Sequence, residues 1–133
     1  MIVDTSALVA ILRREEDADR YVAAIAAADK RGERLAIGAA TLFELMLVID
    51  RLRDPGLSEA TDRLIQLLRL EVVDVSPETA AEARLANRRF GKGFHPARLN
   101  FGDCLVYALA KSTAEPLLFK GDGFAQTDTV SAA

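Results

Sequence analysis

The sequence predicts a single α/β domain across residues 1–133, with a central, mostly parallel sheet of four to five short strands flanked by helices. The main observation is that short apolar runs alternate along the chain with helix-like segments, most of them of ten or more residues. This alternation is typical of crossover connections between parallel strands. The second observation is size, because 133 residues, of which 50% are hydrophobic, suit one buried core.

Each predicted strand is a short apolar run that ends at a polar residue, a glycine or a helix start. Four runs meet this description: residues 1–3, 35–38, 70–75 and 116–119. A fifth, short edge strand is predicted near Thr129 and Val130. The sequence contains no internal repeat, and we expect all of these runs to belong to one sheet.

Apolar residues recur at helical spacing between these strands. The predicted helices are residues 5–12, 18–30, 41–52, a segment from 58, residues 77–90 and 102–111. Thr41 is predicted to be an N-cap because Glu44 follows at capping-box spacing, and Pro55 is predicted to end that helix. The segment around Glu44 is apolar on nearly every side, so we expect this helix to be buried on most of its surface.

Composition excludes several classes of protein. Cys104 is the single cysteine, which excludes an internal disulfide and a cysteine-based zinc site. No apolar run approaches the roughly 20 residues that a membrane span needs, and no basic segment precedes the first apolar residues as in a signal peptide. We therefore expect a cytoplasmic protein without membrane contact. The net charge of −3 argues against nucleic-acid binding by the whole surface, although it allows a local basic patch.

Four acidic residues lie where strands end or helices begin: Asp4, Glu44, Asp103 and Asp122. Each has a purely structural interpretation. Asp4 is a good helix cap, Glu44 completes a capping box, Asp103 is a first-turn acid after the potential N-cap Asn100, and Asp122 lies in a Gly-Asp-Gly turn. Their conjunction favours a site, because carboxyl ends of parallel strands share the edge where open α/β sheets bind ligands.

Several carboxylates in one pocket repel one another and cannot all be ionised without a cation. The cation that suits such oxygen ligands is a hard divalent ion, Mg²⁺ or Mn²⁺. Proteins use such ions mainly to act on phosphate groups. The four acids therefore predict metal-dependent chemistry on phosphate groups.

A basic stretch precedes the last predicted helix. It contains no acid and includes Arg84, Arg88, Arg89, Lys92 and Arg98. On an acidic protein it is the obvious place to hold a phosphate backbone. The alternative is a solvated helix face followed by a loop, and the single histidine of this stretch, His95, is too weak a signal to assign as a general base.

Several segments resemble the PIN-domain proteins, in particular the VapC-type toxins of toxin–antitoxin pairs. The segments are Met1-Ile2-Val3-Asp4-Thr5-Ser6-Ala7, Thr41 to Glu44, Leu99 to Ala110, Pro116 to Gly121, and Phe124 to Asp128. The resemblance implies a PIN fold and a Mg²⁺- or Mn²⁺-dependent ribonuclease acting on RNA. It also implies a homodimer and a cognate VapB-type antitoxin as partner.

By this resemblance, Asp4 and Asp103 look like the principal metal ligands, Glu44 like the third acid, and Ser6 like the hydroxyl that supports Asp4. The chain departs from similar toxins just before Phe124, where Gly123 stands in place of an Asp. Asp122 is then the expected fourth catalytic acid, with Asp128 as its substitute. The number of metal ions stays open.

Two alternatives come from other functional classes. A phospho-acceptor signalling domain also combines an acidic sheet edge with a lysine after a late strand, and Lys120 stands there. Such a domain, however, needs adjacent acids after the first strand, which are missing here. The other alternative is a catalytically silent PIN-like interaction module whose acids only cap helices.

Overall fold

The computed structural model describes residues 1–133 and contains one four-stranded sheet. Its strands are β1 (Ile2–Val3), β2 (Ala36–Gly38), β3 (Glu71–Val73) and β4 (Leu117–Leu118). Their order is β3-β2-β1-β4, and every neighbouring pair is parallel. The predicted α/β class and the largely parallel sheet are therefore confirmed, with each strand shorter than its apolar run.

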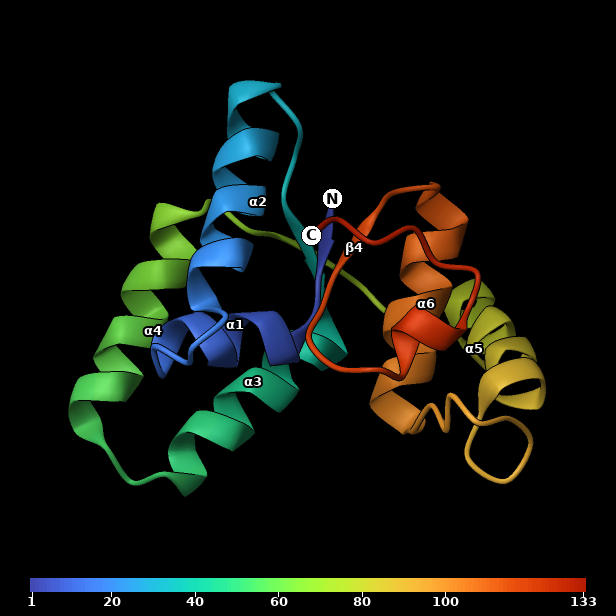
Figure 1. Ribbon diagram of the computed structural model, residues 1–133. Coiled ribbons are helices and arrows are strands. Elements are labelled where there is room, and N and C mark those ends of the chain that lie inside the picture. The colour runs from blue at the N-terminus through green and yellow to red at the C-terminus, as the bar shows by residue number, and fades with distance from the viewer.

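Helices cover both faces of this sheet (Figure 1). They are α1 (Thr5–Leu12), α2 (Ala18–Lys30), α3 (Ala39–Arg51), α4 (Pro55–Leu67), α5 (Pro77–Phe90) and α6 (Phe101–Thr113), with a 3₁₀ turn at Phe124–Gln126. The alternation of side chains along a strand divides the core in two. Ile2 and Leu117 pack with α5 and α6, whereas Val3 and Leu118 pack with α1 to α4.

The start of α3 differs from the prediction. The helix begins at Ala39, directly after β2, and its N-cap is Gly38 in an extended conformation without a side-chain cap. Thr41 lies in the first turn, so the predicted capping box between Thr41 and Glu44 was wrong. The strand leads straight into the helix, and this connection overrides the local capping signal. Glu44 consequently lies inside the helix, where capping no longer explains it.

The start of α4 was also predicted wrongly. Pro55 is the first residue of this helix rather than the end of the previous one, and Ser58 is already inside it. Asp54 caps the helix, since its Oδ1 accepts a hydrogen bond from the Leu57 N–H at 3.2 Å. Proline is favoured at a first helical position because its missing N–H would have no helical partner there.

Helix α3 is not buried on most of its surface, contrary to the prediction. Leu45 and Ile49 are buried, but Phe43, Met46 and Leu47 are 61%, 40% and 38% exposed. The helix packs against α1, α4 and α6, but these contacts leave its Phe43, Met46 and Leu47 face open to solvent. An apolar composition therefore did not imply burial here.

The predicted fifth strand is reduced to a single parallel bridge between Leu117 and Ser131. The Leu117 N–H donates to the Val130 carbonyl at 2.8 Å, and the Ala132 N–H donates to the Leu117 carbonyl at 2.9 Å. The last residues thus lie beside β4 without forming a regular strand. None of the helices combines the length and apolar character needed to cross a membrane.

Candidate active site

Asp4 leaves the sheet at the end of β1 and is held from two sides. Its N–H donates to the Leu118 carbonyl at 2.9 Å, and its carboxylate caps α1 by accepting from the Ser6 N–H at 2.9 Å. The side chain is almost fully buried, and both of its hydrogen bonds fall on Oδ2. No buried side-chain polar atom of the chain lacks a partner, so the other oxygen, Oδ1, must reach the pocket surface. Asp4 therefore caps a helix and still presents an oxygen to a ligand.

The Ser6 hydroxyl links Asp4 to the segment that follows β4. It donates a hydrogen bond to Asp4 Oδ2 and accepts one from the Lys120 N–H at 2.9 Å. This chain of two hydrogen bonds fixes the orientation of the Asp4 carboxylate relative to two neighbouring strands. Such a partner normally orients a metal-binding group.

Asp103 occupies the first turn of α6 in a complete capping box. The Asp103 N–H donates to Asn100 Oδ1 at 2.9 Å, and Asp103 Oδ2 accepts from the Asn100 N–H at 2.8 Å. Asp103 therefore does help to cap the start of α6, as its structural interpretation predicted. This capping role accounts for only one carboxylate oxygen, and the side chain also lines the same pocket as Asp4.

Glu44 reaches the pocket from the second turn of α3. Its Oε2 lies 3.5 Å from the Thr5 hydroxyl, which also donates to the Thr41 carbonyl at 3.1 Å. A Cβ atom added to Gly102 would lie only 3.0 Å from Glu44 Oε2. The glycine thus allows the first turn of α6 to approach Glu44 closely.

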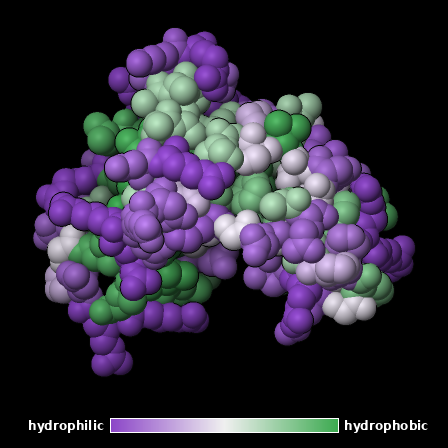
Figure 2. Space-filling view, viewed as in Figure 1, coloured by the Kyte–Doolittle hydropathy of each residue, from purple (hydrophilic) through white to green (hydrophobic).

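These three acids line one open pocket of about 340 Å³, together with Ser6 and Lys120 among others. The acids come from three segments that are distant in the sequence. The first turns of α1, α3 and α6 lie where the group of α1 to α4 meets the group of α5 and α6 (Figure 1). The space-filling view shows a notch at the lower edge of the molecule (Figure 2). The expected gathering of Asp4, Glu44 and Asp103 is therefore present.

The electrostatics of the pocket favour a bound cation. Burial raises the pKa of Asp4, and the nearby Asp103 carboxylate raises it further. Burial also raises the pKa of Glu44, with added repulsion from Asp4 and Asp103, and burial raises the pKa of Asp103. A raised carboxylate pKa means that the charged form is disfavoured, and a cation would relieve that cost.

No group of three acidic, histidine or cysteine side chains is close enough to form a ready-made metal site. Mutual repulsion keeps like-charged carboxylates apart, and Glu44 can move because its side chain has several rotatable bonds. The donor set itself fits a hard cation, since carboxylate and hydroxyl oxygens converge and no soft ligand faces them. The side chains that could hold such an ion are Asp4, Asp103 and Glu44.

Lys120 and Glu15 also line the pocket. The sequence analysis considered Lys120 only for a phospho-acceptor domain and did not single out Glu15. Lys120 Nζ pairs with Glu15 Oε2 at 2.7 Å and with Asp17 Oδ1 at 2.6 Å. Glu15 lies between α1 and α2, and only the fold brings it to the pocket. The ion pairs also hold the Lys120 ammonium that a phospho-acceptor domain would need free.

The two candidates for the fourth acid lie elsewhere. Asp122 is exposed and is not among the residues that line the pocket. Asp128 accepts a hydrogen bond from the Tyr107 hydroxyl at 2.6 Å and pairs with Lys111 at 3.3 Å and Arg89 at 3.5 Å. These contacts hold the carboxyl-terminal segment against α5 and α6.

The basic stretch divides into two kinds of residue. The Arg89 guanidinium is paired with Asp128 and lies 4.7 Å from the Phe90 ring centroid. The remaining four cations make no ion pair within the chain: Arg84, Arg88, Lys92 and Arg98. These four are therefore free to bind an anion.

Comparison with known proteins identifies the family of this chain. The profile of the PIN domain matches residues 1–130. The VapC ribonuclease Mb0625 of Mycobacterium bovis is 50% identical over 128 residues, which are 96% of this chain and 93% of that protein. The chain belongs to the PIN-domain family of VapC ribonucleases. Ribonuclease VapC30 of Mycobacterium tuberculosis, another relative, is 43% identical over 134 residues, covering 100% of this chain and 98% of that protein.

Solved structures of the VapC family have the same fold. VapC20 of Mycobacterium tuberculosis, described as a toxin that cleaves the sarcin–ricin loop, aligns with a TM-score of 0.74 at 16% identity over 97% of this chain and 95% of that one. VapBC2 of Rickettsia felis, solved with a DNA fragment from its promoter, aligns with a TM-score of 0.77 at 16% identity over 98% of this chain and 94% of that one. The comparisons favour neither the phospho-acceptor domain nor the silent interaction module.

Proposed function

We propose that this VapC-family chain is a Mg²⁺- or Mn²⁺-dependent ribonuclease, the toxin of a toxin–antitoxin pair, and that it hydrolyses RNA phosphodiester bonds at the pocket of Asp4, Glu44 and Asp103. The observation that carries the proposal is the convergence of these acids. Three carboxylates from distant segments line one pocket at the carboxyl end of a parallel sheet, and each has a raised pKa. Structural roles account for only part of each side chain.

A divalent cation, when bound, would lower the pKa of a water and stabilise negative charge on the phosphate. The chain's own contribution is to hold the ligand oxygens in place. Ser6 orients the Asp4 carboxylate, the capping box orients Asp103, and Gly102 leaves room for Glu44. The burial of Asp4 lowers the local dielectric response, which strengthens its interaction with any cation.

The direct test is to incubate the purified chain with single-stranded RNA, in Mg²⁺ or Mn²⁺ and with a chelator. Cleavage is expected only with the metal, and it should return when metal is added in excess of the chelator. Equal cleavage under both conditions would exclude metal dependence. No cleavage of any RNA under either condition would favour the silent module.

We place the RNA backbone along the free cations of the basic stretch. Replacing Arg84, Arg88 and Lys92 with Gln should weaken RNA binding and flatten its salt dependence. The log–log slope should fall by about 0.7 for each phosphate of a single strand that the protein no longer neutralises. Binding of RNA to the Asp4→Asn protein, measured across a salt series, gives the slope. Lys30→Gln, on the exposed end of α2, is the matched control. An unchanged slope would limit this stretch to solubility.

Gly102 gives a test of the Glu44 position. In Gly102→Ala the added methyl group meets Glu44 Oε2 at 3.0 Å, so the carboxylate must shift. The shift required is only a few tenths of an ångström. It should therefore reduce the cleavage rate by less than the roughly 100-fold that a displacement of about 1 Å can cause, while alanine in place of glycine favours a helix by about 1 kcal/mol. We therefore expect slower RNA cleavage in a protein whose thermal stability is equal or higher.

A double substitution isolates the cause of that effect. In a Glu44→Ala background, where the carboxylate is gone, Gly102→Ala should have almost no further effect on cleavage. If the two substitutions reduced the rate independently, Gly102 would act through something other than Glu44.

We also propose a cognate VapB-type antitoxin, a homodimer and action on cytoplasmic RNA. The support for a partner is that structures of the same fold include VapBC2 of Rickettsia felis and a toxin–antitoxin complex from Klebsiella pneumoniae. On this chain, Phe43, Met46 and Leu47 form an exposed apolar face of α3 beside Glu44. That face is the surface we expect a protein partner to cover.

A further inference from the structure

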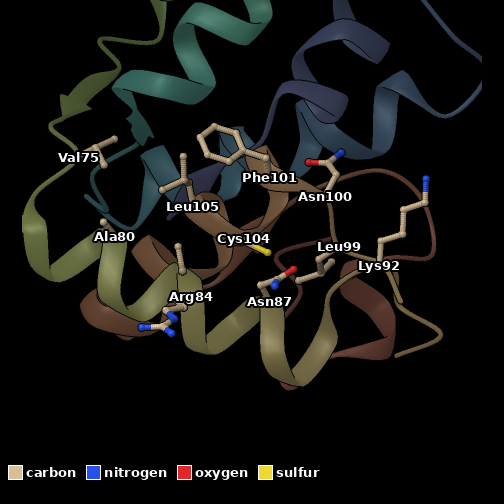
Figure 3. Close-up of a pocket in the computed structure, with 11 residues that line it drawn as sticks. Val75, Ala80, Arg84, Asn87, Lys92, Leu99, Asn100, Phe101, Cys104 and Leu105 are labelled. Carbon is tan, nitrogen blue, oxygen red and sulfur yellow. The ribbon is translucent and has the colours of Figure 1, made fainter. Parts of the chain in front are cut away.

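A second and larger pocket, of about 700 Å³, lies between α5 and the start of α6 (Figure 3). We refer to it as the α5–α6 pocket. Its volume falls within the range of about 300–1,000 Å³ that is typical of small-ligand sites. None of the residues proposed to hold the metal lines it. The proposed ribonuclease function uses only Arg84 and Lys92 of its lining, as cations that hold the RNA backbone, and gives the cavity itself no role.

The walls of the α5–α6 pocket are mainly apolar. Val75, Ala83, Leu99 and Leu105 contribute aliphatic surface, and Phe101 stands at the edge with 85% of its surface exposed. The exposed ring and the apolar walls together form the kind of apolar groove that marks a binding site. A flat aromatic ring beside an apolar cavity is the arrangement on which unpaired nucleobases stack.

The polar groups of the pocket have unused hydrogen-bonding capacity. Asn87 is exposed, and its carboxamide makes no hydrogen bond within the chain; it lies near Cys104 (Figure 3), with its Oδ1 beside Gly91. Arg84 and Lys92 make no ion pair, and their side chains extend from separate edges of the pocket (Figure 3). An amide can read the edge of a base, and the two cations can bind the phosphates on either side.

The α5–α6 pocket adjoins the acidic pocket through the first turn of α6. Asn100 lines the first pocket and exchanges two hydrogen bonds with Asp103, which lines the second. Phe101 is followed directly by Gly102, where an added Cβ would lie 3.0 Å from Glu44 Oε2. A strand of RNA with one phosphate at the acids would therefore bring a neighbouring nucleotide to this pocket.

We infer that the α5–α6 pocket receives an unpaired nucleobase of the RNA, next to the phosphodiester bond that is cut. The inference rests on the proposed function and adds to it a site of base selection. Charge complementarity favours this occupant, since a nucleotide combines a flat apolar ring with a negative backbone. A purely apolar peptide segment would leave both cations and the free amide without a partner.

Cys104 can report occupancy, because it is the chain's single cysteine and lines the α5–α6 pocket. It is only 4% exposed and burial raises the pKa of its thiol, so the modification is followed at alkaline pH, where the reactive thiolate forms. The experiment follows the rate at which a small thiol reagent modifies Cys104 in the Asp4→Asn protein, which should not cut the RNA. Oligo(A), oligo(C), oligo(G) and oligo(U) are compared with an abasic strand of equal length. At least one base-bearing strand should slow the modification several-fold, and the abasic strand should not.

Substitution at the pocket tests the same inference through cleavage. Phe101→Ala and Asn87→Ala should each raise KM or lower kcat/KM by roughly tenfold, the scale of removing one base–aromatic stacking interaction. They should also broaden the choice of base beside the cut. Phe94→Ala removes a Phe that is 65% exposed in the nearby loop but does not line the pocket, and it is the matched control.

The outcomes separate this inference from the proposed function. If the parent protein cuts RNA while Phe101→Ala, Asn87→Ala and Phe94→Ala behave alike, and Cys104 reacts equally fast with and without every RNA, the base site is wrong and the ribonuclease stands. If Phe101→Ala instead weakens self-association or antitoxin binding and leaves base choice unchanged, a protein segment occupies the pocket and the inference is again wrong. If the parent cuts no RNA with any metal, the proposed function itself fails.

Discussion

Asp4→Asn should lower metal-dependent RNA cleavage by well over 100-fold while the protein stays folded. Loss of a group that only orients a metal ligand already costs about 10- to 100-fold, and Asp4 is proposed to bind the ion directly. Asparagine keeps the shape and can still accept the Ser6 hydrogen bonds that cap α1. Single-turnover cleavage, with circular dichroism to confirm the fold, measures the effect. Cleavage at the parental rate would remove Asp4 from the mechanism.

The Asp4→Asn substitution should also change how the stability of the folded protein depends on pH. Because burial raises the pKa of Asp4, the folded protein holds the proton more tightly than the unfolded chain does. Stability is then lost as the pH rises from about 4, the ordinary value for Asp, through the folded pKa. Without metal, Asp4→Asn should be at least as stable as the parent at neutral pH, and this advantage should shrink in acid. Asp62→Asn, on an exposed position of α4, should show no such trend.

Antitoxin binding and Mg²⁺ binding are expected to exclude each other. An inserted Arg of the antitoxin can form hydrogen bonds with two carboxylates at once and replace the charge of the metal at Asp4, Glu44 or Asp103. The exclusion is reciprocal by linkage. Mg²⁺ at 100 times its Kd should weaken the complex by about 2.7 kcal/mol, roughly 100-fold.

The measurement is the dissociation constant of the complex across a Mg²⁺ titration, repeated with the antitoxin's candidate Arg changed to Ala. The Arg→Ala complex should be weaker and should respond much less to Mg²⁺. A complex indifferent to Mg²⁺ would mean that the antitoxin inhibits by covering the RNA path away from the acids.

The sequence was sufficient for the fold class because hydrophobic alternation reports directly on sheet and helix layers. It was less reliable at the ends of elements. Thr41 carried a capping signal that the direct connection from β2 to α3 overrides, and Pro55 was assigned to the end of one helix although it begins the next. Local signals identify where a boundary is near, but the surrounding packing decides which side of it a residue occupies.

The candidate site was only partly predictable, for a similar reason. Asp4 and Asp103 stand at helix starts that the sequence marks, so their gathering at one sheet edge could be inferred. Glu15 reaches the pocket, and Gly102 comes close to Glu44, only through the arrangement of the helices, which no local pattern encodes. The exposure of Phe101 was hidden as well, because hydrophobicity alone predicts burial.

Direct titration of Mn²⁺ by calorimetry is the most immediate test of the proposed metal site. Three proteins are compared: the parent, Asp4→Asn, and Asp122→Asn, whose acid is exposed and does not line the acidic pocket. We expect the parent and Asp122→Asn to bind Mn²⁺ alike, and Asp4→Asn to lose most of that binding. Equal binding by all three proteins, or loss of binding in Asp122→Asn alone, would contradict a metal site formed by Asp4, Glu44 and Asp103.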